Sequence, residues 1–389
     1  MAETFSNELE RWSWDQVGER ILGKTSGEVE TALSRPGACT LEDFMALVSP
    51  AGASYLEEMA HASRELTLRR FGNGIQMFVP MYLSNECTNV CDYCGFSVTN
   101  EIPRKTLTPE EILDEARVIK GHGFDHVLLV SGEAQSIVGP SYFRNAISSL
   151  KPHFSNVSLE VQPLEQEHYE EMIPLGLHAV LVYQETYQRD VYRIHHPKGR
   201  KRNFDYRLAT AERLGGAGIN KIGLGCLLGL ADWRTDLFFL ALHLRFLEKR
   251  FWRTRYSVSF PRLRPFAGEG ELPLSEVSDR DLIQAICAFR LLDPELELSL
   301  STRESPHFRN HATRLGITSM SAGSKTNPGG YANGEDVLEQ FEIDDSREPA
   351  EIERMLNASG YEAVWKDWDS SYDGRGVPKE EPFLCHAKP

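Results

Sequence analysis

Three cysteines lie close together in the segment NECTNVCDYCGFS: Cys87, Cys91 and Cys94. Thiolates bind zinc or iron–sulfur clusters. A structural zinc site usually has four protein ligands in two pairs, but this sequence has no second cysteine pair and no histidine close by. A cluster held by three cysteines leaves one iron without a protein ligand, as a reacting cofactor requires. We therefore expect a catalytic iron–sulfur site, with zinc plus a distant fourth ligand, or free thiols, as alternatives.

Polar residues stand at the ends of several β-rich segments. The second segment ends in Ser131, Gly132 and Glu133, where a glycine allows close approach of the backbone, although a plain turn is the alternative. Glu160 and Gln162 lie near the end of the third segment and share parity, so we expect both side chains on the same side. A carboxylate inside a barrel is costly unless it is used. A buried structural hydrogen bond is the alternative role for Glu160.

Arg303 ends the seventh β-rich segment, and Ser321 lies in the eighth. A guanidinium can hold a carboxylate through two parallel hydrogen bonds, and a small hydroxyl beside it suits an amino acid substrate. A salt bridge between Arg303 and Glu304 or another acid is the alternative. Glu185 lies in YQETY at the end of the fourth segment. A basic loop follows it, which we expect to be solvated or to face a partner, although one arginine could hold a carboxylate; its basic residues are Arg193, Lys198, Arg200, Lys201, Arg202 and Arg207.

Eight β-rich segments alternate with helical segments and must position these residues. The β-rich segments are 77–84, 126–132, 156–164, 178–187, 219–230, 255–265, 296–303 and 317–323. Apolar runs such as HVLLV are typical of strands buried on both faces. Thr108, Pro109 and Glu111 form a capping signature at the start of the first helix. The further helical segments are 140–150, 166–176, 205–218, 233–251 and 278–292.

This alternation predicts a (β/α)8 barrel, with an open doubly wound sheet as the alternative. We expect a helical extension at 1–75, the barrel at 76–330 and an acidic C-terminal tail at 331–389 that packs on the barrel. The tail carries a net charge of −9, from 15 acidic and 6 basic residues. In such a barrel the active site lies at the C-terminal ends of the strands, where the candidate residues stand.

The composition excludes several classes of protein. A net charge of −15 argues against nucleic acid as a partner. No uncharged apolar run is long enough to span a membrane, and the N-terminal residues do not read as a signal peptide. Seven cysteines, an odd and scattered set, favour a reducing compartment. We therefore expect a cytoplasmic location.

The CxxxCxxC spacing after the first strand, with Tyr93 before the last cysteine, resembles the radical S-adenosylmethionine (SAM) superfamily. The resemblance implies a 4Fe–4S cluster held by the three cysteines, with SAM on the open iron. It places Tyr93 beside the adenine, although a packing residue is equally consistent. It implies SAM contacts at Ser131, Gly132, Glu133 and Glu160. Gln162 is included because we expect it on the same side as Glu160. Glu160 would contact the ribose.

Longer strings are similar to the 2-iminoacetate synthases, the tyrosine lyases of thiamine biosynthesis; they include RFGN, EVQPL, VYQETY, RYSVSFPRLRP, LSLSTRESP and SKTNPGGY. The resemblance implies cleavage of L-tyrosine to p-cresol and 2-iminoacetate. Arg303 and Ser321 would hold the amino acid end, and Glu185 is our guess for the acceptor of the phenol proton. Expected partners are the thiazole synthase subunit and an electron donor such as flavodoxin or ferredoxin.

Three other functions compete with this one. Tryptophan-cleaving relatives share the fold and the cysteines. Tyrosine lyases of hydrogenase maturation have an additional cysteine-rich C-terminal domain, whereas only Cys385 stands at this end of the sequence, so we disfavour that activity. A zinc-stabilised barrel that serves as a binding or scaffold protein is the alternative from another class.

Overall fold

The computed structural model describes residues 4–264, 277–332, 334 and 339–366. Pro265, the last residue of the sixth predicted β-rich segment, lies outside the described residues, as do Cys385 and the acidic residues from 367 onwards. None of the helices in the described ranges combines the length and the apolar character needed to span a membrane.

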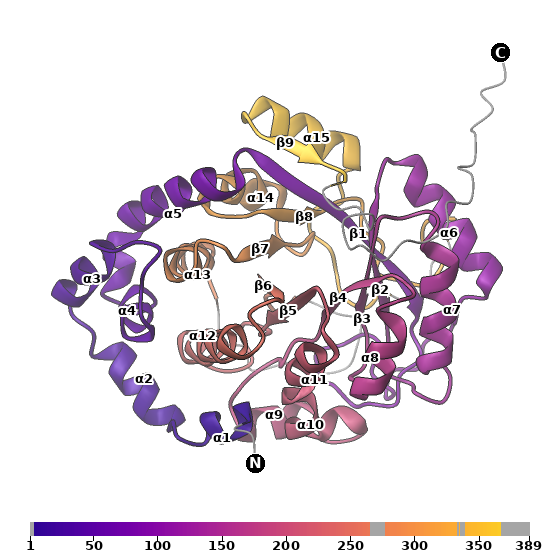
Figure 1. Cartoon of the computed structure of the whole chain (residues 1–389), viewed down its shortest axis with the longest axis horizontal. Helices are drawn as coiled ribbons and strands as arrows, with labels where there is room; N and C mark the ends of the chain where they lie inside the picture. The colour runs from indigo at the N-terminus through magenta and orange to yellow at the C-terminus, as the bar shows by residue number, and fades with distance from the viewer. Residues whose placement is uncertain (1–3, 265–276, 333, 335–338, 367–389) are drawn as a thin grey trace.

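Eight parallel strands form a closed barrel with the helices on its outside (Figure 1). The strands are β1 (Gly74–Ser84), β2 (His126–Ser131), β3 (Asn156–Glu160), β4 (Leu177–Leu181), β5 (Lys221–Gly225), β6 (Arg255–Ser259), β7 (Glu297–Leu300) and β8 (Ser319–Ser321). Each strand pairs with the next, and β8 pairs with β1. The predicted (β/α)8 barrel is confirmed and the open-sheet alternative is wrong.

The helices that surround the barrel follow its strands in order. They are α6 (Pro109–Gly121), α7 (Pro140–Leu150), α8 (Gln166–Met172), α9 (Arg189–His195), α10 (Phe204–Leu208), α11 (Thr210–Ala217), α12 (Trp233–Arg250), α13 (Asp279–Leu292) and α14 (Pro306–Ala312). The capping box at the start of α6 is confirmed, since Thr108 accepts a hydrogen bond from the backbone N–H of Glu111. The predicted helix 205–218 is divided at Ala209, and α14 was not predicted.

Five helices precede the barrel: α1 (Phe5–Leu9), α2 (Trp14–Leu22), α3 (Ser26–Leu33), α4 (Leu41–Leu47) and α5 (Leu56–Phe71). They lie outside α12 and α13 (Figure 1). Trp14 stacks on Phe239 of α12 with ring centroids 5.4 Å apart, and Phe44 meets Phe289 of α13 edge-on at 4.9 Å. Such aromatic pairs bury large apolar areas, so these helices form a second layer on that side of the barrel.

The chain returns to the barrel after β8. Residues 339–347, which we call the C-terminal strap, lie along the mouth of the barrel, because the backbone N–H of Gly95 donates to the carbonyl of Gln340 at 2.9 Å. The helix α15 (Pro349–Ala358) and a short strand β9 (Glu362–Val364) follow. β9 pairs with the start of β1 and was not predicted. The domain boundaries at 75 and 330 stay predictions.

A buried ion pair anchors the strap. Arg309 of α14 pairs with Asp345, both side chains are fully buried, and Arg347 adds a second contact to Asp345 at 2.7 Å. Removing one partner of a buried pair leaves an uncompensated charge and costs about 3–5 kcal/mol. We expect Asp345→Asn to lower the free energy of unfolding by that amount, measured by urea denaturation. Glu171→Gln, which breaks the exposed pair with Arg144, should cost less than about 1 kcal/mol. Equal losses in the two variants would contradict the assignment.

Candidate active site

One cavity opens at the C-terminal ends of the barrel strands and encloses about 1220 Å³ including its mouth. Among the residues singled out from the sequence it is lined by Tyr93, Cys94, Glu160, Glu185, Arg303 and Ser321. Glu133 and Gln162 line a smaller cavity that shares Lys201 with the large one. Strands β1, β3, β7 and β8 thus bring their predicted residues to a single place, as a barrel requires.

The cysteines lie on the loop after β1. Cys91 is buried, and Cys87 and Cys94 are half-buried. Arg104 holds the loop, since its guanidinium donates to four backbone carbonyls, including those of Asn85 at 2.7 Å and residues 96, 97 and 100. Burial raises the pKa of the Cys91 and Cys94 thiols, while nearby Lys201 lowers both. Arg104 thus ties together backbone groups on both sides of the cysteines, and a positive charge at the thiols would favour their thiolate forms.

Gly132 sets the distance between the end of β2 and this loop. A Cβ at this position would lie 2.3 Å from the carbonyl oxygen of Glu86, so only glycine fits. The backbone N–H of Gly132 also donates to the carbonyl of Ser84 at 2.9 Å. Beside it, the buried hydroxyl of Ser131 has no hydrogen-bond partner among the described residues. Gly132 serves close packing of two backbones here, and Ser131 keeps a polar group available.

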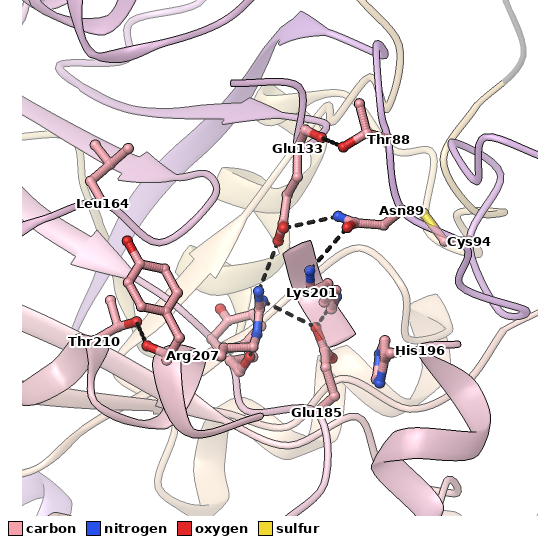
Figure 2. Close-up of polar contacts among 12 residues, drawn as sticks. Thr88, Asn89, Cys94, Glu133, Leu164, Glu185, His196, Lys201, Arg207 and Thr210 are labelled. Atoms are coloured by element: carbon pink, nitrogen blue, oxygen red, sulfur yellow. Dashed lines mark hydrogen bonds and ion pairs between the residues drawn. The ribbon is translucent and has the colours of Figure 1, made fainter. Parts of the chain in front are cut away.

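Figure 2 shows four charged side chains that gather beside the cysteine loop. The Glu133 carboxylate accepts from Arg207 at 2.8 Å and from the Asn89 amide at 2.9 Å. Glu185 accepts from Lys201 at 2.7 Å and from Arg207 at 3.4 Å. Burial alone would raise the pKa of Glu133, but Arg207 and Lys201 outweigh it and lower this pKa. The two acids and two bases compensate one another.

Glu185 is held by contacts of its side chain and its backbone, and its role as acceptor of the phenol proton stays a prediction. Its carboxylate already accepts from two cations, and its backbone has a φ of 69°, the only positive φ of a non-glycine among the described residues. Its carbonyl accepts from the N–H of Leu227 at 2.8 Å, which joins the ends of β4 and β5. Such strain persists only where the surroundings impose it. In this position Glu185 pairs with both Lys201 and Arg207.

Tyr93 is fixed at the edge of the cavity. Its hydroxyl lies 2.5 Å from Nε2 of His196, whose Nδ1 lies 2.7 Å from the carbonyl of Tyr192. A carbonyl can only accept, so Nδ1 carries the proton and Nε2 accepts from Tyr93. Burial lowers the pKa of His196 to about 2, which keeps the imidazole neutral. The ring of Tyr93 is thus held in one orientation.

Arg303 is a half-buried cation that has no acidic partner among the described residues. No described residue places a carboxylate within 4 Å of its guanidinium, which instead lies 3.4 Å from the ring centroid of Phe341 in the strap. Glu304, the partner weighed from the sequence, pairs with Arg262 and with Arg264 at 3.0 Å. The salt-bridge alternative for Arg303 is wrong. Burial lowers the pKa of Arg303, and the guanidinium faces the cavity ready for an anion.

Glu160 and Gln162 do not face the same cavity, contrary to the parity argument. β3 ends at Glu160, so the alternation of side chains does not continue to Gln162. The Gln162 amide donates to the carbonyl of Val138 at 2.6 Å, and its Oε1 is buried without a described partner. Glu160 lines the large cavity, and no described group hydrogen-bonds its carboxylate. Burial raises the pKa of Glu160 to about 7, although Arg303 lowers it.

Two family models match the chain, the Radical SAM superfamily at residues 81–240 and the Biotin and Thiamin Synthesis associated domain at 259–362. The chain is 52% identical over 374 residues to the 2-iminoacetate synthase of Escherichia coli (strain K12), an alignment that covers 96% of this chain and 98% of that protein. The 2-iminoacetate synthase of Salmonella typhimurium is 51% identical over 369 residues, with coverage of 95% and 97%. The chain belongs to the 2-iminoacetate synthase family.

A solved structure with the same fold is that of HydG, a maturase of the [FeFe]-hydrogenase, with a TM-score of 0.85 and 31% identity. The match covers 91% of this 2-iminoacetate synthase family member and 79% of HydG. The cofactors of the family are a 4Fe–4S cluster and SAM, as expected from the cysteine spacing.

The cysteine loop of this 2-iminoacetate synthase family member fits a cluster better than a single metal ion. No group of three or more His, Cys, Asp or Glu side chains in the described ranges could hold one metal ion. The three thiols lie on one loop, and a 4Fe–4S cluster binds each thiolate through a different iron. Cys87 and Cys94 also pack against the buried apolar side chains of Tyr82, Phe96 and Leu128. An apolar surface beside soft ligands suits such a cluster.

Several site residues were not identified from the sequence. Lys201 and Arg207 were expected in a solvated or partner-facing loop, in which one arginine could hold a carboxylate. Arg207 is buried and pairs with two carboxylates, and Lys201 is 11% exposed. The other basic residues of that loop are exposed as expected: Arg193, Lys198, Arg200 and Arg202. The buried and the exposed basic residues differ only in their contacts with residues that are distant in the sequence. Gln340 and Phe341 of the strap also line the cavity, and no sequence signal marks them.

The raised pKa of Glu160 predicts a pH dependence of stability. Its ordinary pKa is 4.5, so between pH 4.5 and 7 the unfolded chain loses this proton first, and stability falls as pH rises. Glu160→Gln cannot ionise, so we expect it to be more stable than the unaltered protein at pH 8, by roughly 3 kcal/mol at most, and no more stable at pH 4. Urea denaturation at both pH values measures this. Glu167→Gln, on the exposed side of α8, controls for net charge, and a gain independent of pH would contradict the assignment.

Proposed function

We propose that this protein cleaves the Cα–Cβ bond of L-tyrosine to give p-cresol and 2-iminoacetate, with 5′-deoxyadenosine and methionine as co-products, for thiazole formation in thiamine biosynthesis. The family relationship supports this activity over nearly the whole chain. The observation that carries it is the free Arg303 guanidinium in the same cavity as Cys94, because it brings an amino acid carboxylate to the cluster side of the barrel.

The proposed cofactor sites follow from the placement of the side chains. Cys87, Cys91 and Cys94 would hold the 4Fe–4S cluster, and SAM would lie between Cys94 and Glu160. When bound, the two cofactors supply a 5′-deoxyadenosyl radical that removes a hydrogen atom from the substrate. Glu160 offers a carboxylate with free acceptors for the ribose hydroxyls. Tyr93, whose hydroxyl is fixed by His196, offers its ring to the adenine.

The remaining predicted cofactor residues have distinct proposed roles. Gly132 brings the end of β2 against the cysteine loop, and Ser131 has a free hydroxyl for the amino end of SAM. Glu133 holds Arg207 and Asn89 and thereby the cysteine loop itself. Gln162 has a free amide oxygen in the adjoining cavity. These placements support a SAM pocket whose wall is built by β2 and β3.

Arg303 and Ser321 are proposed to bind the amino acid end of tyrosine. Phe341 supports one face of the Arg303 guanidinium and leaves its donors free to form a bidentate pair with a carboxylate. The Ser321 hydroxyl accepts from the backbone N–H of Thr302 at 3.2 Å, so its own proton remains available for donation. Apolar side chains lie on the cavity wall for the aromatic ring: Phe78, Pro80, Leu128, Val130 and Leu181.

Two partners belong to the proposal. The product 2-iminoacetate hydrolyses readily, so we propose direct transfer to the thiazole synthase subunit. The cluster also requires an electron donor such as flavodoxin or ferredoxin. We place these reactions in the cytoplasm, consistent with the free cysteines among the described residues.

The decisive assay is anaerobic incubation of the reconstituted protein with SAM, dithionite and tyrosine. We expect p-cresol and 5′-deoxyadenosine in comparable amounts, measured by mass spectrometry. Tryptophan in place of tyrosine should give no indole fragment. If 5′-deoxyadenosine is released and tryptophan is fragmented while no p-cresol forms, tyrosine is rejected as the substrate. Bound zinc without the absorbance of an iron–sulfur cluster would reject the radical chemistry.

Replacement of Arg303 tests the carboxylate site. We expect Arg303→Met to lower kcat/KM for tyrosine about 100-fold, because losing a desolvated charge pair costs roughly 2–5 kcal/mol. Cleavage of SAM in the absence of tyrosine should continue. Arg202→Met, at an exposed arginine outside the cavity, is the control. If Arg303→Met lowers both rates equally, Arg303 has a structural role instead.

A further inference from the structure

The C-terminal strap places a side-chain amide beside one of the cysteines. Nε2 of Gln340 lies 3.8 Å from Sγ of Cys94, within hydrogen-bond distance for sulfur. On its other side, Oε1 of Gln340 accepts from the hydroxyl of Tyr82 at 2.7 Å. One amide thus bridges β1 and the cysteine loop, although Gln340 lies 246 positions after Cys94.

Only one orientation of the Gln340 side-chain amide satisfies its hydrogen-bond partners. A thiolate accepts hydrogen bonds and cannot donate them, so it requires the NH₂ group of Gln340. The carbonyl then faces Tyr82, whose hydroxyl can donate to it. Tyr82 is itself buried on β1 and packs edge-on against Phe96 at 5.9 Å, so this donor has little freedom. Both ends of the Gln340 amide are therefore satisfied at once.

The backbone of the strap is fixed on both sides of this amide. The N–H of Gln340 donates to the carbonyl of Thr326 at 3.2 Å, and its carbonyl accepts from the N–H of Gly95, next to Cys94. A Cβ on Gly95 would lie 2.5 Å from the carbonyl oxygen of Glu339, so the strap and the cysteine loop are in direct backbone contact. The buried pair of Arg309 and Asp345 anchors the far end of the strap. The Gln340 side chain therefore needs little further ordering to place its N–H donor beside Cys94.

We propose that Gln340 is a positioning residue that raises the reduction potential of the cluster by donating an N–H···S hydrogen bond to the Cys94 thiolate. Reduction adds negative charge to the cluster and its sulfur ligands. A donor aimed at a ligand sulfur therefore stabilises the reduced form more than the oxidised form. The proposal rests on Cys94 as a cluster ligand, as proposed above, and not on the identity of the substrate.

The test is an EPR-monitored redox titration of the reconstituted enzyme without tyrosine. Gln340→Met keeps the length of the side chain and removes the donor. We expect its midpoint potential to be more negative, so that a smaller fraction of cluster is reduced at any fixed potential. Coupling of the reduced cluster to an exchangeable proton, measured in H₂O and D₂O, should also decrease. An unchanged midpoint potential would overturn the proposal.

Two further variants separate tuning from loss of structure. Thr326→Val removes a hydroxyl bond to the carbonyl of Phe341 in the same strap but leaves the amide in place, so its midpoint should equal that of the unaltered enzyme. Tyr82→Phe keeps Gln340 but removes its anchor, and we expect a smaller shift in the same direction. If Gln340→Met fails to retain iron, the midpoint potential of Tyr82→Phe is the deciding measurement. An unchanged midpoint potential in Tyr82→Phe would then overturn the proposal.

The ligand assignment is tested separately. Cys94→Ala should lose the intact cluster, measured by iron content and absorbance, while Cys287→Ala, at a buried cysteine of α13, should keep it. An intact cluster in Cys94→Ala would reject Cys94 as a ligand and with it the role of Gln340. Loss of the cluster there, together with an unchanged potential in Gln340→Met, would reject only the role of Gln340.

Discussion

Four charged side chains lie together, buried or nearly so, at the mouth of the barrel, where an isolated buried charge would cost several kcal/mol. Glu133 and Glu185 come from the ends of β2 and β4, and Lys201 and Arg207 come from the segment after α9. Each charge is tolerated because the opposite charges are in contact with it. Asn89 links this group to the cysteine loop, since its amide donates to Glu133 and its carbonyl accepts from the N–H of Lys201. The position of the loop thus depends on charge compensation as much as on apolar packing.

Ion pairing also distinguishes Arg303 from the other cations at the cavity. Among the described residues, the cations that line the large cavity are Lys201, Arg264 and Arg303. Lys201 is paired with Glu185 and Arg264 with Glu304, whereas Arg303 contacts an aromatic ring. An unpaired and partly buried guanidinium is unfavourable in the absence of an anion. The substrate carboxylate completes a charge balance that the chain leaves open.

The sequence predicted those structural features that depend on residues close together in the chain. Apolar runs such as HVLLV located the barrel strands, and the capping residues located the start of α6. The position of Arg303 at the end of a strand placed it at the cavity, because barrel topology fixes where strand ends meet. Parity failed for Gln162 because the strand ends at Glu160. Lys201 could not be separated from exposed basic neighbours, since its burial depends on Glu185 from another element.

The C-terminal strap also constrains the order of assembly. It contacts the cysteine loop through its backbone, at Gly95, and it follows all eight barrel strands in the sequence. During synthesis on the ribosome the barrel strands emerge before the strap, so the cysteine loop is not yet covered by it. The backbone contact at Gly95 and the Arg309–Asp345 pair can therefore form only after all eight strands have been made, so the strap is the last of these parts of the site to be added.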